Sequence, residues 1–239
     1  MIVSHRHRFI FVRTRKTAGT SVEIALSKFC GPADVITRDA DDALRRQLGY
    51  PGPQNDGGIP LRSYTFSEWR RLLTRGERAR FKNHTPAARI RALVGETVWR
   101  EYYKFAIERN PWDKAISLYF WRTRSMNPRP PLLDFLRDVG ARSLSNAHIY
   151  LIDGALAVDR MIEYDRLAEG LEHVRSRIGL AEPLALPRAK ATHRAERTHY
   201  SELIGPAERA VIDAACAREI ALFDYRFEGA PRGVDSHPD

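Results

Sequence analysis

Two short segments carry side chains suited to binding anions. The first, RKTAGTS, runs from Arg15 to Ser21 directly after the apolar stretch FIFV and combines two basic residues with three hydroxyls. The second, ERNPWDKAIS, contains Arg109 and, eight residues later, Ser117. Cationic side chains, hydroxyls and the backbone amides at a helix start are the groups that bind phosphate or sulfate in proteins. The sequence therefore predicts two anion sites.

The first segment differs from the Walker A loop of ATP- and GTP-binding proteins. That loop has the pattern GxxxxGK[ST], whereas here Lys16 precedes the single Gly19 and no glycine lies upstream. The order is inverted, but amides at the start of the following helix still point outward and carry the positive end of its dipole. A basic turn with capping hydroxyls is the alternative interpretation. The residues expected to bind one anion are Arg15, Lys16, Thr17, Ala18, Gly19, Thr20 and Ser21.

The apolar pattern predicts the elements that position these segments. A buried strand is expected at Phe9–Arg13, and helical spacing begins at Gly19 and ends at Gly31-Pro32. Further strands are predicted in KFAIERNP and at Val158–Tyr164; further helices follow Pro111, run along Leu167–Ile178 and extend from near Pro206 to about Leu222. This alternation predicts an α/β fold of the P-loop type, with three layers and a central, mainly parallel sheet flanked by helices. Both anion segments would lie at the carboxyl edge of that sheet, where ligands bind.

The length of 239 residues predicts a single domain, 1–239. Within it, Thr37–Arg62 is dense in turn residues and is expected to be a long loop or insertion, either a functional lid or a tolerated surface segment. Helices are predicted after it, one behind a capping box made by Thr65 and Glu68 and one from Pro86. Residues 36–100 are therefore interpreted as an inserted loop and helical lobe near the acceptor cleft.

The net charge of +9 and the pI near 9.8 favour anionic ligands or partners, although an Arg-rich solvated surface would give the same balance. No apolar run approaches the roughly 20 residues of a membrane span, and no signal peptide is evident, so a cytoplasmic location is predicted. Cys30 and Cys216 make no disulfide framework and are expected in the core. His5 and His7 lack an evident third ligand, so no metal site is predicted.

The two anion segments together resemble a known family. KTAGTS resembles the 5′-phosphosulfate loop of the sulfotransferases that use 3′-phosphoadenosine 5′-phosphosulfate (PAPS), and RNPWDKAIS resembles their 3′-phosphate motif. The similarity extends from Phe9 to about Phe227 and is strongest to the carbohydrate and heparan sulfate branch. It implies that Lys16–Ser21 bind the phosphosulfate and that Arg109 and Ser117 bind the 3′-phosphate. Golgi members carry an N-terminal anchor, which is not evident here, so a soluble enzyme of bacterial type is expected.

Sulfuryl transfer to a hydroxyl also needs a base. His84, in KNHTPAAR between the two motifs, occupies the region where relatives keep a catalytic histidine, and we expect His84 and Lys16 to be catalytic. A capping or surface role is the alternative for His84. Weaker base candidates are His148, His193 and His199, while Asp113, Asp159 and Glu163 are expected to be structural or charge-pairing. Relatives also close a late basic loop over the nucleotide, which implies a binding role for Lys190 and Arg194, although a solvated loop fits equally well.

The acceptor is predicted to be an anionic glycan or glycoconjugate hydroxyl. Aromatic side chains suit stacking on sugars, and arginines suit their acidic groups. The side chains expected there are Tyr64, Trp69, Trp121, Arg71, Arg122 and Arg124. Two other functions remain open at this point: a P-loop-like kinase that uses ATP and magnesium, against which the inverted loop argues, and a basic nucleic-acid-binding protein, which only the charge suggests.

Overall fold

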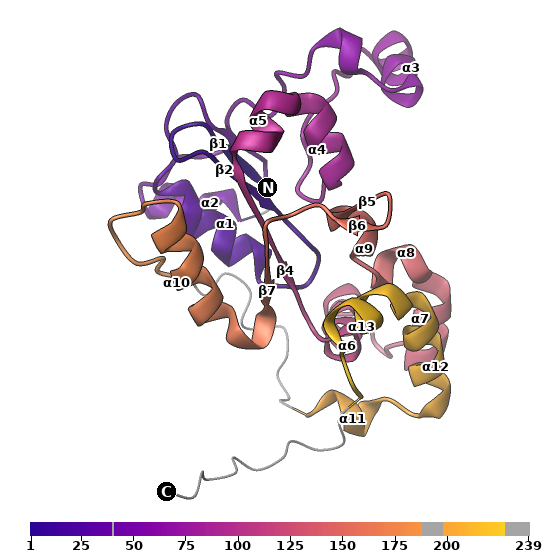
Figure 1. Ribbon diagram of the computed structural model, residues 1–239. Helices are drawn as coiled ribbons and strands as arrows, with labels where there is room; N and C mark the ends of the chain where they lie inside the picture. Colours follow the sequence, from indigo (N-terminus) through magenta and orange to yellow (C-terminus); the bar gives the residue numbers. More distant parts are fainter. Residues whose placement is uncertain (40, 188–197, 228–239) are drawn as a thin grey trace, which may run out of the picture. The chain divides into compact units, whose positions relative to one another are not determined.

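The computed structural model describes residues 1–39, 41–187 and 198–227 (Figure 1). The chain divides into two compact units, each treated by itself. Unit 1 comprises the described residues of Met1–Glu108 and His148–Lys190, and unit 2 those of Arg109–Ala147 and Ala191–Asp239. Unit 1 contains the sheets of the described chain, whereas unit 2 is helical there.

Unit 1 is built on a five-stranded sheet in the order β3-β1-β2-β4-β7. Its strands are β1 (Ile2–Ser4), β2 (Phe9–Val12), β3 (Val35–Ile36), β4 (Tyr103–Glu108) and β7 (Arg160–Glu163). β2, β4 and β7 are parallel neighbours, with Phe9 opposite Tyr103 and Phe105 opposite Arg160. β1 runs antiparallel to both of its neighbours. The predicted α/β class is thus confirmed, with a mixed sheet whose core is mostly parallel.

Helices cover both faces of this sheet. On one face α1 (Gly19–Ser27) and α10 (Leu167–Arg177) pack Val22, Leu26 and Val174 against the strand residues Phe9, Phe11 and Phe105. On the other face Lys104 of β4 places its ammonium over the ring of Trp99 in α5 (Glu96–Glu101) and donates to the Trp99 carbonyl at 3.0 Å. Because both faces are covered, FIFV is buried along its whole length, as expected for a strand in a parallel sheet.

The rest of unit 1 consists of short elements. These are α2 (Asp42–Gln47), η1 (Leu61–Ser63), α3 (Phe66–Arg75), α4 (Ala87–Val94), β5 (Leu151–Ile152), β6 (Ala155–Leu156) and η2 (Tyr164–Arg166). α3 has the predicted capping box: the Thr65 side chain accepts from the Glu68 amide, and the Glu68 carboxylate accepts from the Thr65 amide. α4 begins directly after Pro86, also as predicted.

Unit 2 packs its helices around a separate core that includes Trp112, Ile116, Leu136, Ile212 and Cys216. The indole of Trp112 donates to Asp213 at 2.7 Å and joins the first helix of the unit to a later one. Its helices are α6 (Pro111–Arg122), α7 (Leu132–Val139), α8 (Ala141–Leu144), α11 (Tyr200–Leu203), α12 (Pro206–Ala215) and α13 (Ala217–Phe223); α9 (Ala147–Tyr150) stands where the chain passes from unit 2 to unit 1.

Two sequence-based expectations were wrong in detail. The single helix predicted from Pro206 to about Leu222 is two helices, because Cys216 has non-helical backbone angles, φ −113° and ψ 19°. The segment Thr37–Arg62 is not simply a long loop: it contains α2, and the Arg45 side chain on that helix is completely buried. The helix was not predicted because the segment is rich in turn residues and the charged sequence DALRRQ shows little apolar periodicity.

Candidate functional site

The loop between β2 and α1 adopts a backbone conformation that non-glycine residues rarely take. Lys16 has φ 61° and Ala18 has φ 57°, both in the left-handed region. Such strained backbone is concentrated at functional sites in proteins. The loop therefore bends sharply without the glycines of a Walker A loop.

The helix that follows this loop starts without a capping side chain. Ala18 makes no side-chain cap of α1, and no acidic residue lies in the first turn of the helix. The helix-start amides and the positive end of the helix dipole are thus combined with the neighbouring cations Arg15 and Lys16. This arrangement suits an anion.

Two of the predicted anion-binding hydroxyls make internal hydrogen bonds. The Thr17 hydroxyl lies 2.8 Å from the Thr14 hydroxyl, which in turn donates to the Ile107 carbonyl on β4. The Thr20 hydroxyl accepts from Arg13 at 2.6 Å and donates to Asp39 at 3.3 Å. These hydroxyls hold the loop on the sheet, and their contact with an anion stays a prediction. Ser21 is half-buried at the start of α1.

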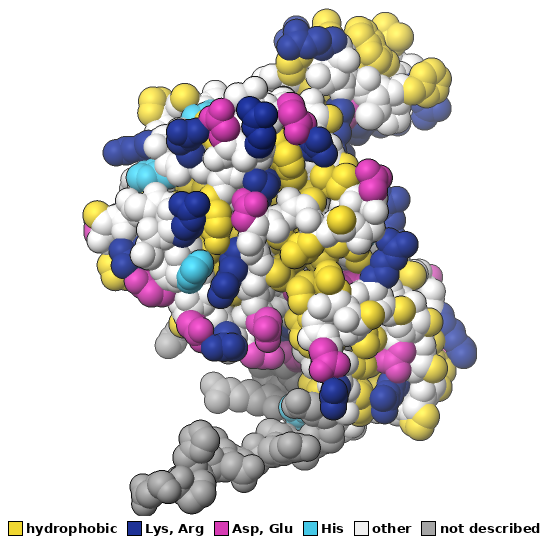
Figure 2. Space-filling view, viewed as in Figure 1, with side chains coloured by type: hydrophobic (Ala, Val, Ile, Leu, Met, Phe, Trp, Pro, Cys, Tyr) yellow, Lys and Arg dark blue, Asp and Glu magenta, His cyan; other side chains and the backbone are white. Residues whose placement is uncertain are grey.

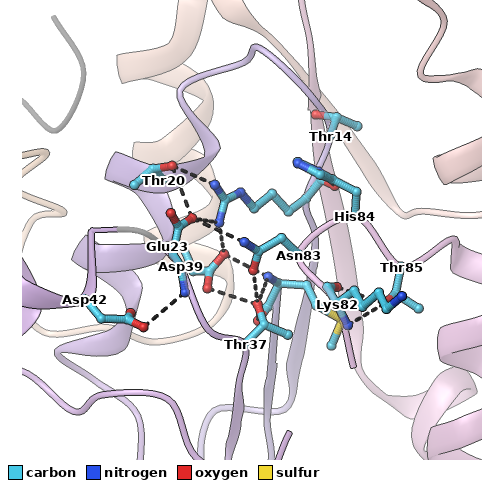
Figure 3. Close-up of polar contacts among 12 residues, drawn as sticks. Thr14, Thr20, Glu23, Thr37, Asp39, Asp42, Lys82, Asn83, His84 and Thr85 are labelled. Atoms are coloured by element: carbon cyan, nitrogen blue, oxygen red, sulfur yellow. Dashed lines mark hydrogen bonds and ion pairs between the residues drawn. The ribbon is translucent and has the colours of Figure 1, made fainter. Parts of the chain in front are cut away.

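A buried charge cluster lies beneath the loop (Figure 3). Glu23 of α1 binds Arg13 at 2.7 Å, Arg45 at 2.8 Å and the amino group of Met1 at 2.7 Å, and Arg13 also pairs with Asp39. Burial alone would raise the pKa of Glu23, but the three cations outweigh it and lower that pKa. Removing one member of such a cluster destabilises the protein, because it leaves a buried charge without compensation.

The position of Gly19 is explained by this cluster. A Cβ at residue 19 would lie 2.8 Å from Cγ of Arg13, whose side chain crosses directly under the start of α1. The glycine therefore lets the buried guanidinium approach the helix start closely. The Nε atom of Arg13 is buried there and makes no hydrogen bond with the described residues.

His84 lies at the first residue of the same loop. Its Nδ1 is 3.1 Å from the backbone carbonyl oxygen of Arg13. A carbonyl can only accept, so Nδ1 carries the proton and Nε2 carries the lone pair. Burial, followed by the charges of Arg13 and Arg15, lowers the pKa of His84 to about 4. The imidazole is therefore neutral at pH 7, and Nε2 can accept a proton.

Hydrogen bonds around the neighbouring Asn83 position this histidine. The Asn83 side chain accepts from the Thr37 hydroxyl at 2.7 Å and donates to Asp39 at 3.4 Å. Asp39 in turn pairs with Arg13 and accepts from Thr20 in the first turn of α1. The segment predicted as an insertion thus supplies residues that connect His84 to the anion loop.

Sequence reasoning missed this supporting network: Arg13, Glu23, Thr37, Asp39 and Asn83. One signal was present, because Glu23 stands beside Val22 and Ile24 on a helix that is buried nearly throughout. A charge in such a helix needs a partner, but the pattern does not say which residue supplies it.

The other predicted histidines lie in different places. His148 of α9 reaches the loop, where its Nε2 accepts from Arg15 at 3.2 Å. His5 contacts the Tyr102 hydroxyl at 2.8 Å, beside the start of β4 and therefore away from the carboxyl edge of the parallel strands. His199 lies in unit 2 and contacts the Ser201 hydroxyl at 2.7 Å. His193 falls outside the described residues.

The second predicted motif belongs to unit 2. Arg109 directly follows β4 in the chain, and its guanidinium pairs with Asp113 at 2.5 Å, so Asp113 is charge-pairing as expected. Ser117 is half-buried on α6, whose start is capped by the Asn110 side chain. Lys190 and Arg194 lie outside the described residues. Cys30 and Cys216 are both buried and unbridged, as predicted.

The acidic residues of β7 differ in their contacts. Asp159, just before the strand, pairs with Lys104 at 2.9 Å and also accepts from the Lys104 amide, so it is structural as expected. Glu163, at the end of β7, is exposed.

One of the predicted sugar-stacking residues is in the wrong place. Tyr64 is buried, and its hydroxyl accepts from the Ala79 amide at 3.0 Å, so its ring is not available to a ligand. Trp69 packs against it with ring centroids 5.6 Å apart and stays partly exposed. The spacing of aromatic residues could not distinguish these two, because both lie near the start of α3.

Comparison with known proteins gives one relative. The chain is similar to an uncharacterized protein of Archaeoglobus fulgidus, with 32% identity over 103 residues that cover 41% of this chain and 86% of that protein. At this identity and coverage, the two chains belong to the same family, and the relative's name states no activity. No profile of a known protein family and no solved structure matches the chain. None of the helices in the described residues has the length and apolar character needed to cross a bilayer.

Proposed function

We propose that this chain is a sulfotransferase that moves a sulfuryl group from PAPS to an acceptor hydroxyl. The observation that carries the proposal is the contact of His84 with Arg13. This hydrogen bond places a neutral histidine beside a basic loop at the start of α1. The Nε2 lone pair of the histidine points away from the hydrogen bond. Resemblance of KTAGTS and RNPWDKAIS to the motifs of this enzyme class supplies the identity of the donor.

The proposed reaction is an in-line displacement at sulfur. The acceptor oxygen forms a bond to sulfur while its proton passes to Nε2 of His84, and the bond between sulfur and the bridging phosphate oxygen breaks. The products are the sulfate ester and adenosine 3′,5′-bisphosphate. Lys16 and the amides at the start of α1 stabilise the negative charge that develops on the leaving 5′-phosphate.

The remaining donor contacts follow from the motifs. We assign the phosphosulfate to residues 15–21 and the 3′-phosphate to Arg109 and Ser117, with Lys190 and Arg194 as further nucleotide contacts. The ion pair of Arg109 with Asp113 supports this role, because the carboxylate fixes the direction of a guanidinium that directly follows β4. We further propose that the sheet belongs to the three-layer P-loop type, on the strength of the strand–loop–helix order at Lys16.

We propose an anionic glycan or glycoconjugate as the acceptor, and Tyr64 is no longer among the residues expected to contact it. Trp69 and Trp121 supply aromatic surface, and Arg71, Arg122 and Arg124 supply positive charge. Arg124 lies with its guanidinium 4.9 Å from the ring centre of Trp121, a cation–aromatic pair suited to an acidic sugar.

The experiment that tests the function compares ligands of the purified protein by calorimetry. Adenosine 3′,5′-bisphosphate should bind with micromolar affinity, and ATP with magnesium should bind at least about tenfold more weakly. Incubation with sulfur-labelled PAPS and a uronic-acid polysaccharide should then give labelled polymer without added magnesium. Equal or tighter binding of ATP would instead favour a kinase, and binding of neither nucleotide, with a salt-sensitive gel shift of DNA, would favour a nucleic-acid-binding protein.

A further inference from the structure

Helix α3 exposes an apolar face that nothing in the described chain covers (Figure 2). None of its ten residues is buried, although a helix of this length is only marginally stable in water without packing. Phe66 is 86% exposed and Leu73 is 80% exposed, and Leu61 of the preceding η1 is 49% exposed. Phe66 and Leu73 are separated by two helical turns and therefore project from the same side.

Arginines surround this apolar face. Residues 61–80 contain six arginines and two glutamates, a net charge of +4 from those side chains. Glu68, one of the two acids, is held by Arg89 at 2.6 Å, and Arg80 is held by Asp56 at 3.0 Å. Arg62 and Arg70 are exposed, and Arg70 lies one helical turn after Phe66 on the same side of α3, whereas the exposed Arg75 projects from the opposite side. In Figure 2 hydrophobic and basic side chains lie side by side over this part of unit 1.

The charge pattern distinguishes between possible partners of this face. A second copy of the chain would bring two arginine-rich surfaces together in a symmetric contact, which like-charge repulsion opposes. An anionic bilayer satisfies both parts of the pattern, because its headgroups attract the arginines while its interfacial region accepts Phe, Leu and Trp side chains. The apolar side chains are individually exposed, as insertion between headgroups requires.

We propose that α3 binds the surface of anionic lipid membranes. Phe66, Leu73 and Leu61 enter the interface between headgroups and acyl chains, Trp69 lies at headgroup level, and Arg62 and Arg70 pair with lipid phosphates. The binding is peripheral, and it involves the same helix whose Trp69 and Arg71 are assigned to the acceptor under the proposed function.

Sedimentation of the full chain with lipid vesicles tests this proposal. The protein should pellet with vesicles of equal parts phosphatidylglycerol and phosphatidylcholine, and at least about tenfold less with phosphatidylcholine alone. Raising the salt concentration should weaken the binding because it screens the headgroup charges. The double variants Phe66→Ser/Leu73→Ser and Arg62→Gln/Arg70→Gln should each lower the apparent partition constant about tenfold or more.

Leu222→Ser is the matched control, because Leu222 is an exposed leucine on α13 of unit 2. This variant should bind vesicles like the parent, and circular dichroism should show all variants folded. Two results would overturn the proposal: unchanged vesicle binding in both double variants, or no vesicle binding by the parent. If the parent instead dimerises, or captures an acidic protein, and Phe66→Ser/Leu73→Ser abolishes that contact without any lipid binding, the face is a protein interface. Sulfate transfer to a soluble acceptor is measured separately, so the two proposals can fail independently.

Discussion

His84 owes its chemical state to its surroundings more than to its type. Burial and the charges of Arg13 and Arg15 keep it neutral, and the Arg13 carbonyl selects the tautomer. A bound phosphosulfate would partly cancel the two arginine charges and raise the pKa of the imidazole toward its ordinary value. The site would thus make His84 a better base when the donor is present.

We expect kcat/KM to be constant at neutral pH and to fall only as pH drops through about 4, where His84 of the free protein becomes protonated. The midpoint for kcat should be higher, because the donor raises that pKa. His84→Asn should lower kcat by ~10²–10⁴, whereas His148→Asn is the control at the same loop. A larger loss in the His148 variant would transfer the base role to that residue.

The same pKa shift predicts an effect on stability that does not depend on activity. Between about pH 6.5 and pH 4 the unfolded chain binds a proton at His84 that the folded chain does not. The free energy of unfolding should therefore decrease as the pH falls through this window. His84→Gln should lack this component in urea unfolding curves measured across the same pH range.

Lys16 should act mainly in the transition state, because the charge it faces develops as the 5′-phosphate leaves. Lys16→Ala is expected to lower kcat by ~10²–10³ while the dissociation constant of adenosine 3′,5′-bisphosphate changes much less. Lys28→Ala, which removes a surface lysine paired with Glu182, is the control. A change confined to KM for PAPS would make Lys16 a binding residue only.

At the scale of single elements, helix propensity and packing against the sheet have opposite preferences at Gly170 of α10. Gly170 lies inside the helix, where alanine would be favoured by propensity by about 1 kcal/mol. A Cβ at that position would, however, clash with Ile162 of β7, so the glycine sets how closely α10 packs on the sheet.

Gly170→Ala should therefore destabilise the protein by roughly 1–3 kcal/mol despite its better helix propensity. Urea unfolding measures the difference. Gly52→Ala is the matched control, because a Cβ there meets nothing within 4 Å and should leave the midpoint nearly unchanged. A stabilised Gly170→Ala variant would mean that α10 can move outward at little cost.

The elements with strong local signals could be predicted from the sequence. FIFV, the helix after Gly19, the Thr65–Glu68 cap and the strand before Arg109 all depend on neighbouring residues, and all are present. β1, β3 and α2 were missed because they are short and are defined by distant partners, such as Ile2 pairing with both Phe11 and Ile36. The ion pairs of Glu23 were not predicted for the same reason, because they join residues far apart in the chain.

At the scale of the whole molecule, the positive charge of unit 1 is found at two distinguishable places. Part of it lies at the loop between β2 and α1, where Arg13 is ion-paired with Glu23 and Asp39 and where Arg15 and Lys16 are proposed to bind an anion. Another part surrounds the exposed apolar face of α3. A net charge of +9 could indicate only that some anion is favoured, whereas the structure shows where in unit 1 these two groups of cations lie.

The sheet order also has a consequence for how the chain can fold during synthesis. β2 pairs with β4, so the edge of β2 at Phe9 stays unpaired until Tyr103 has been synthesised. β4 in turn gains its second neighbour only after Arg160 of β7 has been synthesised. Until β4 has left the ribosome, β2 has an unpaired edge in one of the most apolar stretches of the chain. Such edges promote association between nascent chains, and distant pairings slow folding. The N-terminal hundred residues should therefore depend on chaperone protection, and fragments that end before β4 should aggregate when expressed alone.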